Sequence, residues 1–202
     1  MNEDLKNLIN HININFIKFS ELWEENNSYS RINLKKKFVK DIIPDSNILN
    51  QILNYQSFLL KEAIELEFSL KKQIIDSAEI LTRIKTIDSI SYKVNRYTNE
   101  KLEKGFVPIC KCLNDIFGVR IILNNSVNIE ELKSFLKYDY PSLKLINASK
   151  KDYKANHIYF CKTNYDFRWE LQIWNIKDKN NNIESHAKYK QSYTNWIKKR
   201  GE

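Results

Sequence analysis

Apolar residues recur at helical spacing through the first part of the chain. Between residues 47 and 78 they follow one another every three or four positions and form a single stripe, which predicts a long amphipathic helix. Residues 3–25 show a mixed helical pattern, and Asp45 and Ser46 are suited to cap the longer helix at its N-terminus. The stripe is typical of a packing face, so we expect residues 1–80 to form a helical N-terminal segment.

The second part of the chain changes to short runs rich in β-branched and aromatic residues. Residues 117–123 (FGVRIIL) and 143–146 read as strands. In residues 156–162 and 167–174 the residue types alternate along the chain, and this pattern also predicts strands. The turn-like residues 164–166 between the last two runs favour a hairpin.

Helical patterns and loops separate these strands. Helices are expected over residues 89–103, 109–116, 128–139 and 185–199, with Ser126 as a cap and residues 177–182 (KDKNNN) as an exposed loop. The chain therefore predicts one α+β domain, in which a mixed β-sheet of four to five strands is flanked by helices. Within it, residues 81–202 would form the catalytic core.

The charge of the chain favours polyanionic partners. Its 202 residues carry a formal net charge of +8, which suits nucleotides, RNA, DNA or an anionic membrane. Lys35, Lys36 and Lys37 stand in a row and could bind RNA, although a run of lysines also suits a solvated surface.

The cysteines and the apolar runs bear on the compartment. Three cysteines, Cys110, Cys112 and Cys161, cannot all pair and do not complete a zinc site, so we expect buried thiols in a reducing cytoplasm. Residues 1–8 are polar and do not resemble a signal peptide, and no apolar run approaches the roughly 18 residues that a membrane span needs.

A first group of polar residues could hold a triphosphate. Arg83 and Lys85 alternate, so on an extended chain their side chains point to the same side. Ser89 and Lys93 are four residues apart and share a face if this segment is helical. Ser89 also suits a helix N-terminus, which attracts phosphate. Taken alone, the group also fits ordinary exposed basic residues.

Two carboxylates are placed for metal binding. Asp115 comes just before an apolar strand, where it could hold Mg²⁺ or simply cap a helix or turn. Glu170 and Gln172 share one face of a strand that we expect to be central. A carboxylate there is costly unless it is paired or binds a metal, which makes Glu170 the strongest functional candidate.

An aromatic and cationic segment precedes the strand at residue 157. Tyr153 could stack on a base, and Lys154 and His157 could meet phosphates, although a tyrosine packed on a loop would look the same. Together with the carboxylates, these groups fit phosphoryl or pyrophosphoryl transfer, in which a protein mainly positions groups and neutralises charge. Neither a P-loop nor a kinase glycine loop occurs in the sequence.

In this order the segments resemble the synthetase domain of the RelA/SpoT homologue family, over roughly residues 80–198. The family motif R-x-K…S…K is matched by Arg83, Lys85, Ser89 and Lys93, and D-x-x-G-x-R is matched by Asp115, Gly118 and Arg120. The motif G-Y-[RKQ]-x-x-H is matched by Tyr153, Lys154 and His157. The motif E-[LIV]-Q-[IV] is matched by Glu170 and Gln172, and H-x-x-Y-K by His186, Tyr189 and Lys190. Each motif is weak by itself, and five in register are a specific signal.

The resemblance implies a nucleotidyltransferase-like fold and an ATP-dependent pyrophosphokinase, in which a ribose 3′-hydroxyl attacks the β-phosphorus of ATP and AMP leaves. It implies that Asp115 and Glu170 are catalytic and hold Mg²⁺, and that Glu170 orients or deprotonates the hydroxyl. ATP would be bound by Arg83, Lys85, Ser89, Lys93 and Arg120, and the acceptor by Tyr153, Lys154, His157, Gln172, His186 and Lys190.

Two departures from the family pattern bear on the acceptor. Asp152 replaces the loop glycine, and Ser185 replaces the glutamate that usually precedes the last histidine. The residues within and around the motifs are similar to those of the toxic small alarmone synthetases. This resemblance implies transfer of pyrophosphate to the 3′ CCA end of tRNA, inhibition of translation and a cognate antitoxin protein. No membrane and no DNA partner are expected.

Two other functions stay open from the sequence. One is a small alarmone synthetase that makes (p)ppGpp or (p)ppApp from guanosine or adenosine nucleotides. The other is a catalytically inert nucleotide-binding or RNA-binding module, against which the intact pair of Asp115 and Glu170 argues.

Overall fold

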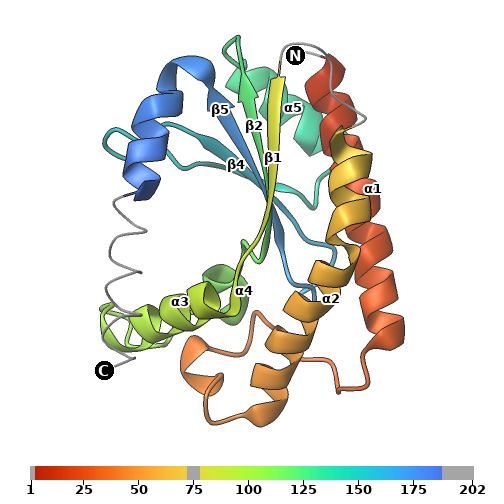
Figure 1. Ribbon diagram of the computed structural model, residues 1–202, viewed down its shortest axis with the longest axis vertical. Coiled ribbons are helices and arrows are strands. Elements are labelled where there is room, and N and C mark those ends of the chain that lie inside the picture. The colour runs from red at the N-terminus through yellow and green to blue at the C-terminus, as the bar shows by residue number, and fades with distance from the viewer. Residues whose placement is uncertain (1–2, 72–77, 188–202) are drawn as a thin grey trace.

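A five-stranded mixed sheet lies at the centre of the computed structural model, which describes residues 3–71 and 78–187 (Figure 1). The strands are β1 (Ala78–Ile84), β2 (Phe117–Leu123), β3 (Lys144–Asn147), β4 (Asn156–Phe160) and β5 (Trp169–Asn175). Their order across the sheet is β1-β2-β5-β4-β3. Only β2 and β5 run parallel, and the other neighbours are antiparallel. The expected α+β class and the central place of β5 are confirmed.

Helices cover one face of this sheet and flank the other. They are α1 (Glu3–Asn26), α2 (Ser46–Lys71), α3 (Ile87–Asn99), α4 (Ile109–Cys112) and α5 (Ile129–Asp139), followed by a helical stretch over residues 179–187. Two single turns of 3₁₀-helix lie at Val39–Asp41 and Ile176–Asp178. Figure 1 shows α1 and α2 against one side of the sheet, with α3 and the helical stretch 179–187 at the two ends of the other side.

The alternation of β5 explains which side is the core. Trp169, Leu171 and Ile173 all belong to the main apolar cluster. Phe16 and Phe19 of α1 meet the Trp169 ring edge-on, at centroid distances of 5.6 and 5.5 Å. The intervening residues of β5 therefore face away from α1 and α2, toward the flanked side of the sheet.

The predicted long helix is confirmed as α2, which is described as far as Lys71, the last described residue before residue 78. Residue 78, expected to close the helix, instead begins the strand β1. The residues of β1 pair along the whole of β2, so a long-range partner rather than local propensity decides their conformation. Asp45 caps α2 as predicted, because its Oδ1 accepts hydrogen bonds from two backbone N–H groups of the first turn.

Two predicted capping residues were wrong, although the helix expected over residues 128–139 is confirmed within one residue as α5. Thr86, not Ser89, caps α3, since Thr86 Oγ1 accepts the N–H of Ser89. Asn128 caps α5, and Ser126 instead accepts a hydrogen bond from Asn175. The helix expected over residues 109–116 is limited to the four residues of α4.

The prediction of an exposed loop over residues 177–182 was also wrong. This polar stretch forms a 3₁₀ turn and the first part of the helical stretch 179–187. Asn182 within it is fully buried, and its side chain accepts the backbone N–H of Lys154 and donates to the Lys154 carbonyl. Of the helix expected over residues 185–199, the part after residue 187 lies outside the described residues.

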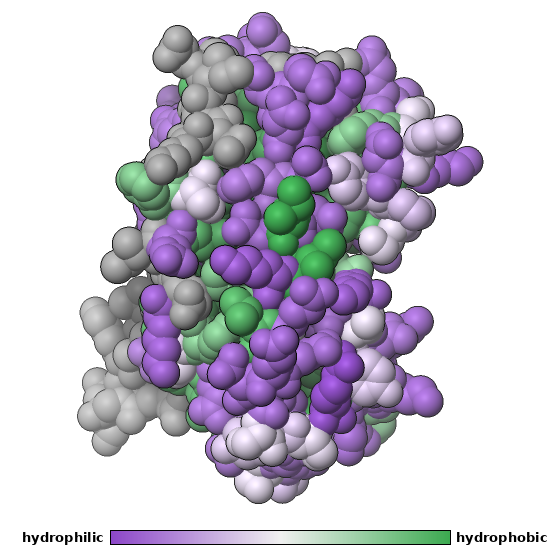
Figure 2. Space-filling view, turned by 90° about the vertical axis from the view of Figure 1, so that its right-hand side faces the viewer, coloured by the Kyte–Doolittle hydropathy of each residue, from purple (hydrophilic) through white to green (hydrophobic). Residues whose placement is uncertain are grey.

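The outer surface of α1 and α2 is mostly hydrophilic (Figure 2). Exposed apolar side chains on these helices include Ile14, Leu60 and Phe68. No helix among the described residues is both long enough and apolar enough to span a lipid bilayer. The expected burial of the thiols is confirmed for Cys110 and Cys112, whereas Cys161 is half-buried.

Candidate active site

Strand register brings most of the sequence-predicted residues onto the face of the sheet that lies away from α1 and α2. One row across the strands contains Arg83, Gly118, Glu170 and Tyr159, and the next contains Leu81, Arg120, Gln172 and His157. Residues in register on neighbouring strands are close enough for their side chains to interact. The face is therefore a single polar surface built from four strands.

Asp115 lies at the entrance to β2 and is held by two lysines. Lys85 Nζ donates to Asp115 Oδ2 at 2.6 Å, and Lys93 Nζ donates to Asp115 Oδ1 at 3.0 Å. Lys85 reaches this position because its backbone N–H donates to the carbonyl of Ile116, directly after β1. Lys93 reaches it from α3. The two lysines expected to bind ATP phosphates thus converge on the expected catalytic carboxylate.

The charges of this trio set its protonation states. Burial opposes the ionisation of Asp115, but the two ammonium groups outweigh it and hold the pKa of Asp115 well below its ordinary value. Burial also disfavours the charge on Lys93, yet the Asp115 carboxylate dominates and raises the pKa of Lys93. Asp115 is therefore ionised at neutral pH and acts as the counter-ion of the lysines while no substrate is bound.

The other expected ATP-binding residues border this trio. Arg83 is exposed on β1, directly opposite Gly118. Ser89 lies in the first turn of α3, where its Oγ accepts a hydrogen bond from Thr86. Ser89 and Lys93 thus lie on α3, whose N-terminus and dipole favour a phosphate, and Arg83 lies on the strand that precedes this helix.

Glu170 is buried at the centre of the sheet and accepts three hydrogen bonds. Tyr159 Oη donates to Oε1 at 2.8 Å, and His157 Nδ1 lies 2.9 Å from the same oxygen. Gln172 Nε2 donates to Oε2 at 2.7 Å. Burial and the charge of Asp115 oppose ionisation, but the hydrogen bonds and the His157 contact outweigh them and lower the pKa of Glu170. Glu170 is therefore held as a carboxylate.

A chain of hydrogen bonds orients the histidine that contacts Glu170. Trp174 Nε1 donates to Tyr153 Oη at 3.3 Å, and Tyr153 Oη lies 2.9 Å from His157 Nε2. Because the Glu170 carboxylate can only accept, the proton of a neutral imidazole lies on Nδ1 and points at Glu170. The Nε2 of His157 then accepts the hydroxyl hydrogen of Tyr153.

Arg120 joins this chain to the helical stretch 179–187. Its Nε donates to Gln172 Oε1 at 3.1 Å, and its guanidinium lies 3.8 Å from the centroid of the Trp174 ring. The imidazole of His186 stacks on the same Trp174 ring, at a centroid distance of 5.6 Å. Burial, with the charge of Arg120, lowers the pKa of His186 to about 4, so its imidazole is neutral at physiological pH.

Not every sequence-predicted residue enters this network. The side chain of Lys154 is exposed, although its backbone is bound by Asn182. Lys35, Lys36 and Lys37 are exposed outside the sheet face, and only Lys37 has an ion-pair partner among the described residues, at 3.8 Å from Asp45. Lys190 lies outside the described residues.

Sequence reasoning missed three residues of the site. Tyr159 alternates with His157 on β4, and this spacing could have placed its hydroxyl beside Glu170. Trp174 shares the face of Glu170 by the same rule, but its apolar ring concealed its role as a donor to Tyr153. No local signal marks Asn182, because it lies in a run of polar residues.

The carboxylates could also hold a divalent cation. No group of three or more His, Cys, Asp or Glu side chains suited to a metal occurs in the described part of the chain. Mg²⁺, however, commonly takes one or two carboxylates together with substrate phosphates. Asp115 and Glu170 fit such an ion if it arrives with the triphosphate. The triphosphate would then replace Asp115 as the ion-pair partner of Lys85 and Lys93.

Gly118 leaves the centre of this face open, which gives a first prediction. A Cβ at this position would meet only the Glu170 carbonyl oxygen, at 3.9 Å, so Gly118→Ala should fold normally. Gly118→Leu would extend a side chain between Arg83 and Glu170 and should lower kcat/KM by about 100-fold, since displaced substrates lose their alignment. Thermal melting and steady-state kinetics of both variants check this. A fully active Gly118→Leu enzyme would show that substrates do not occupy this face.

A comparison with known protein families identifies the segment that contains this site. A family model described as the region found in RelA / SpoT proteins matches residues 82–194, which is more than half of the chain. The match begins within β1 and includes the other four strands of the sheet. Among curated protein sequences there is no significant match.

Similar solved structures include the small alarmone synthetase 1 from Bacillus subtilis. It is 19% identical over 74% of this chain and 82% of that chain, with a TM-score of 0.43. The same protein bound to AMPCPP is 18% identical over the same shares of both chains, with a TM-score of 0.40. These values are too low to transfer a ligand or an assembly to this chain. On the family match, the chain belongs to the RelA/SpoT family, and the expected enzyme class, an ATP-dependent pyrophosphotransferase, is confirmed.

Proposed function

We propose that this enzyme transfers pyrophosphate from ATP to the 3′-hydroxyl at the CCA end of tRNA, and that it is the toxin of a toxin–antitoxin pair. The donor side is the group around α3, where Arg83, Lys85 and Lys93 face the phosphates of ATP with Ser89 and Arg120. The acceptor side is the network around His157. Glu170 lies between the two sides and contacts the acceptor network directly.

The residues of the chain suit a direct displacement. The acceptor 3′-oxygen forms a bond to the β-phosphorus, the bond from the β-phosphorus to the oxygen bridging it to the α-phosphorus breaks, and AMP leaves. Glu170, held ionised and oriented by His157 and Tyr159, receives the hydroxyl proton. Lys85 and Lys93 neutralise the phosphates. A bound Mg²⁺ would supply further neutralisation of the phosphate charge.

The observation that carries the tRNA acceptor is the place of the basic segment, residues 34–37. The N–H of Leu34 donates to the carbonyl of Asn164 at 2.9 Å, and the Leu34 carbonyl accepts the N–H of Cys110 at 2.9 Å. The carbonyl of Lys37 accepts the N–H of Ile109 at 2.9 Å. The basic segment is thus fixed between the loop after β4 and α4, the element that leads into Asp115.

Exposed lysines at this place suit a polynucleotide more than a free nucleotide. Lys35 and Lys36 have no ion-pair partner among the residues that the structure describes, so their charge is available for phosphates beyond the active site. A free guanosine nucleotide would need only the polar face of the sheet, on which neither lysine lies. Their position therefore supports an acceptor with a phosphate backbone.

An enzyme that modifies tRNA in this way would need an inhibitor in the cell. A pyrophosphate on the terminal 3′-oxygen blocks aminoacylation of tRNA, so uncontrolled activity would stop translation. A cognate antitoxin protein that inhibits this cytoplasmic activity is the partner we infer. Coexpression of the protein encoded beside this chain should restore growth, and failure of any neighbouring protein to do so would argue against the toxin role.

Labelled ATP distinguishes the possible acceptors. Purified enzyme receives ATP labelled at the β-phosphate together with deacylated tRNA, GDP, GTP or AMP in separate reactions. Label on tRNA, lost when the 3′-hydroxyl is first oxidised with periodate, supports the proposal. Label on guanosine or adenosine nucleotides alone would contradict it and would indicate synthesis of (p)ppGpp or (p)ppApp.

Charge reversal of the basic segment is a second prediction. The triple variant Lys35→Glu, Lys36→Glu, Lys37→Glu should lower kcat/KM for tRNA by at least about tenfold and weaken its salt dependence, because phosphate contacts are lost. The KM for ATP should stay unchanged. Reversal of three exposed lysines elsewhere (Lys18, Lys133 and Lys137) gives the same net charge and is the control. Equal effects of both variants would show a general charge effect and no specific contact.

A further inference from the structure

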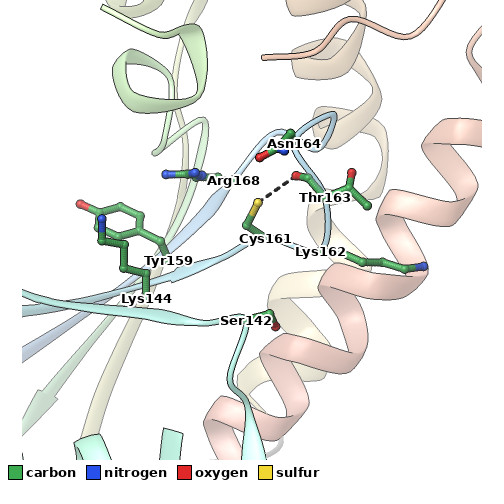
Figure 3. Close-up of a pocket in the computed structure, with 8 residues that line it drawn as sticks. All are labelled: Ser142, Lys144, Tyr159, Cys161, Lys162, Thr163, Asn164 and Arg168. Atoms are coloured by element: carbon green, nitrogen blue, oxygen red, sulfur yellow. Dashed lines mark hydrogen bonds between the residues drawn. The ribbon is translucent and has the colours of Figure 1, made fainter. Parts of the chain in front are cut away.

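A polar cavity borders the active site at the β3–β4 edge of the sheet (Figure 3). Its volume is about 290 Å³. The residues that line it include Lys144, Tyr159, Lys162, Asn164 and Arg168. Three of these residues are basic and none is acidic, so the cavity suits an anion.

Two of the three cations point the same way. In Figure 3 the side chains of Lys144, Tyr159 and Arg168 extend to the same side of the strands, whereas Lys162 extends in the opposite direction. Lys162 Nζ is paired with Glu21 at 3.1 Å. Lys144 stands directly opposite Tyr159 in the register of β3 and β4. The cation pair that serves the cavity is therefore Lys144 and Arg168.

Arg168 carries a donor that lacks an acceptor. Its Nε is buried and has no hydrogen-bond partner among the described residues. A guanidinium presents its N–H groups in a planar fork that matches two oxygens of a phosphate. Arg168 lines the cavity, so its charge and the N–H groups other than the solvent-shielded Nε are what it offers a phosphate there.

The cavity lies on the path between the basic segment and the catalytic carboxylate. On one side, Tyr159 lines the cavity and donates to Glu170 at 2.8 Å. On the other side, Asn164 lines the cavity and accepts the N–H of Leu34 at 2.9 Å. An extended strand of RNA whose last ribose meets Glu170 would therefore pass the cavity before it reaches Lys35 and Lys36.

We propose that this cavity binds a backbone phosphate of the acceptor strand, next to the terminal nucleoside. The inference rests on the proposed function and adds to it a phosphate site separate from the donor-side lysines. Arg168 and Lys144 hold the phosphate through charge, and Arg168 also does so through its fork of donors. Because phosphate contacts fix the register of a nucleic acid, the site positions the 3′-hydroxyl at Glu170.

Binding of a fluorescent RNA minihelix that ends in CCA, without ATP, tests the site. Lys144→Ala and Arg168→Gln should each raise its Kd by about tenfold and reduce the slope of log Kd against log salt by roughly one. Arg168→Lys should restore part of the affinity, since charge returns without the fork. Lys162→Ala is the matched control and should stay within about twofold of wild type, because its charge points away. The KM for ATP should not change in any of them.

Nucleotide acceptors separate this inference from the proposed function. Wild-type enzyme that neither binds nor modifies the minihelix contradicts the tRNA acceptor. The cavity is then judged with GDP, whose 5′-phosphates have the same chemistry, and a raised KM for GDP in Lys144→Ala and Arg168→Gln supports it. The cavity site is overturned if these variants leave both acceptors unaffected, if Lys162→Ala weakens binding equally, or if only the KM for ATP rises.

Discussion

Glu170→Gln should lower kcat for pyrophosphate transfer by about 1,000-fold while the protein stays folded. The substitution keeps the size of the side chain and removes the charge that receives the hydroxyl proton, and general-base catalysis by a positioned group contributes typically about 10²- to 10⁴-fold. Kinetics with saturating ATP, together with the KM for ATP, measure the effect. An unchanged KM would show that the loss lies in the chemical step.

The neighbours of Glu170 explain why an amide cannot substitute for it. A glutamine can still accept from Tyr159 through its carbonyl oxygen, but its NH₂ group would then face the Nε2 of Gln172. Gln172 cannot turn its amide around without losing Arg120, whose Nε donates to its oxygen. One buried donor is thus left unpaired, which costs about 1–3 kcal/mol of folding free energy.

A surface carboxylate supplies the control for this prediction. Glu130 lies exposed in the first turn of α5, and Glu130→Gln should change kcat by less than about twofold, because surface substitutions rarely matter. If Glu170→Gln keeps more than a tenth of wild-type activity, Glu170 is not the group that receives the proton. If it unfolds, Glu170→Asp tests the role with the charge retained.

Local periodicity predicted those parts of the site that depend on the alternation of a single strand. Alternation along β5 was enough to place Glu170 and Gln172 on one face, because the side-chain period of a strand is two whatever it pairs with. The same rule could have placed Tyr159 beside His157. Features of this kind need no knowledge of the rest of the chain.

The parts that were missed depend on distant partners. The strand β1 was not among the predicted strands, and the expected helix reached its first residue, because only its pairing with β2 marks the segment as a strand. That pairing also brings Lys85 to Asp115, 30 positions along the chain, so the use of Asp115 as a counter-ion could not be read from either segment. Asn182 is polar and was predicted in a loop, but its burial follows from the backbone of residue 154, which needs its hydrogen bonds.

Asp115→Asn should have the largest effect on stability of any single substitution in the site. It leaves the ammonium groups of Lys85 and Lys93 side by side without their counter-ion, since both now donate to the carboxylate. Removal of one partner from a fully buried ion pair costs about 3–5 kcal/mol, and because the Asp115 side chain is partly exposed we expect a loss near the lower end of that range. Chemical denaturation at neutral pH measures the loss, and Asp139→Asn, an exposed site, should cost less than about 0.5 kcal/mol.

The dependence of this loss on pH has a defined sign. Because the folded-state pKa of Asp115 lies below its ordinary value of 3.8, the stabilisation is complete above that value and disappears as the pH falls toward the folded-state pKa. The gap in stability between wild type and Asp115→Asn should therefore be constant from neutral pH down to about 5 and close in stronger acid. A gap that stays open in acid would mean that the effect is not electrostatic.

The same substitution should reverse the preference of the site for metal-free and metal-bound phosphates. Without the carboxylate, tripolyphosphate in the absence of metal meets two lysines and no opposing charge, so the Asp115→Asn variant should bind it about tenfold more tightly than wild type and regain much of its lost stability. The Mg²⁺ complex of ATP should bind the variant less tightly, because one oxygen ligand for the ion is gone. Calorimetry with both ligands decides between the two roles of Asp115. A variant that loses affinity for both phosphates equally would show that Asp115 only shapes the pocket, whereas opposite changes would identify it as counter-ion of the lysines before substrate binds and ligand of the metal afterwards.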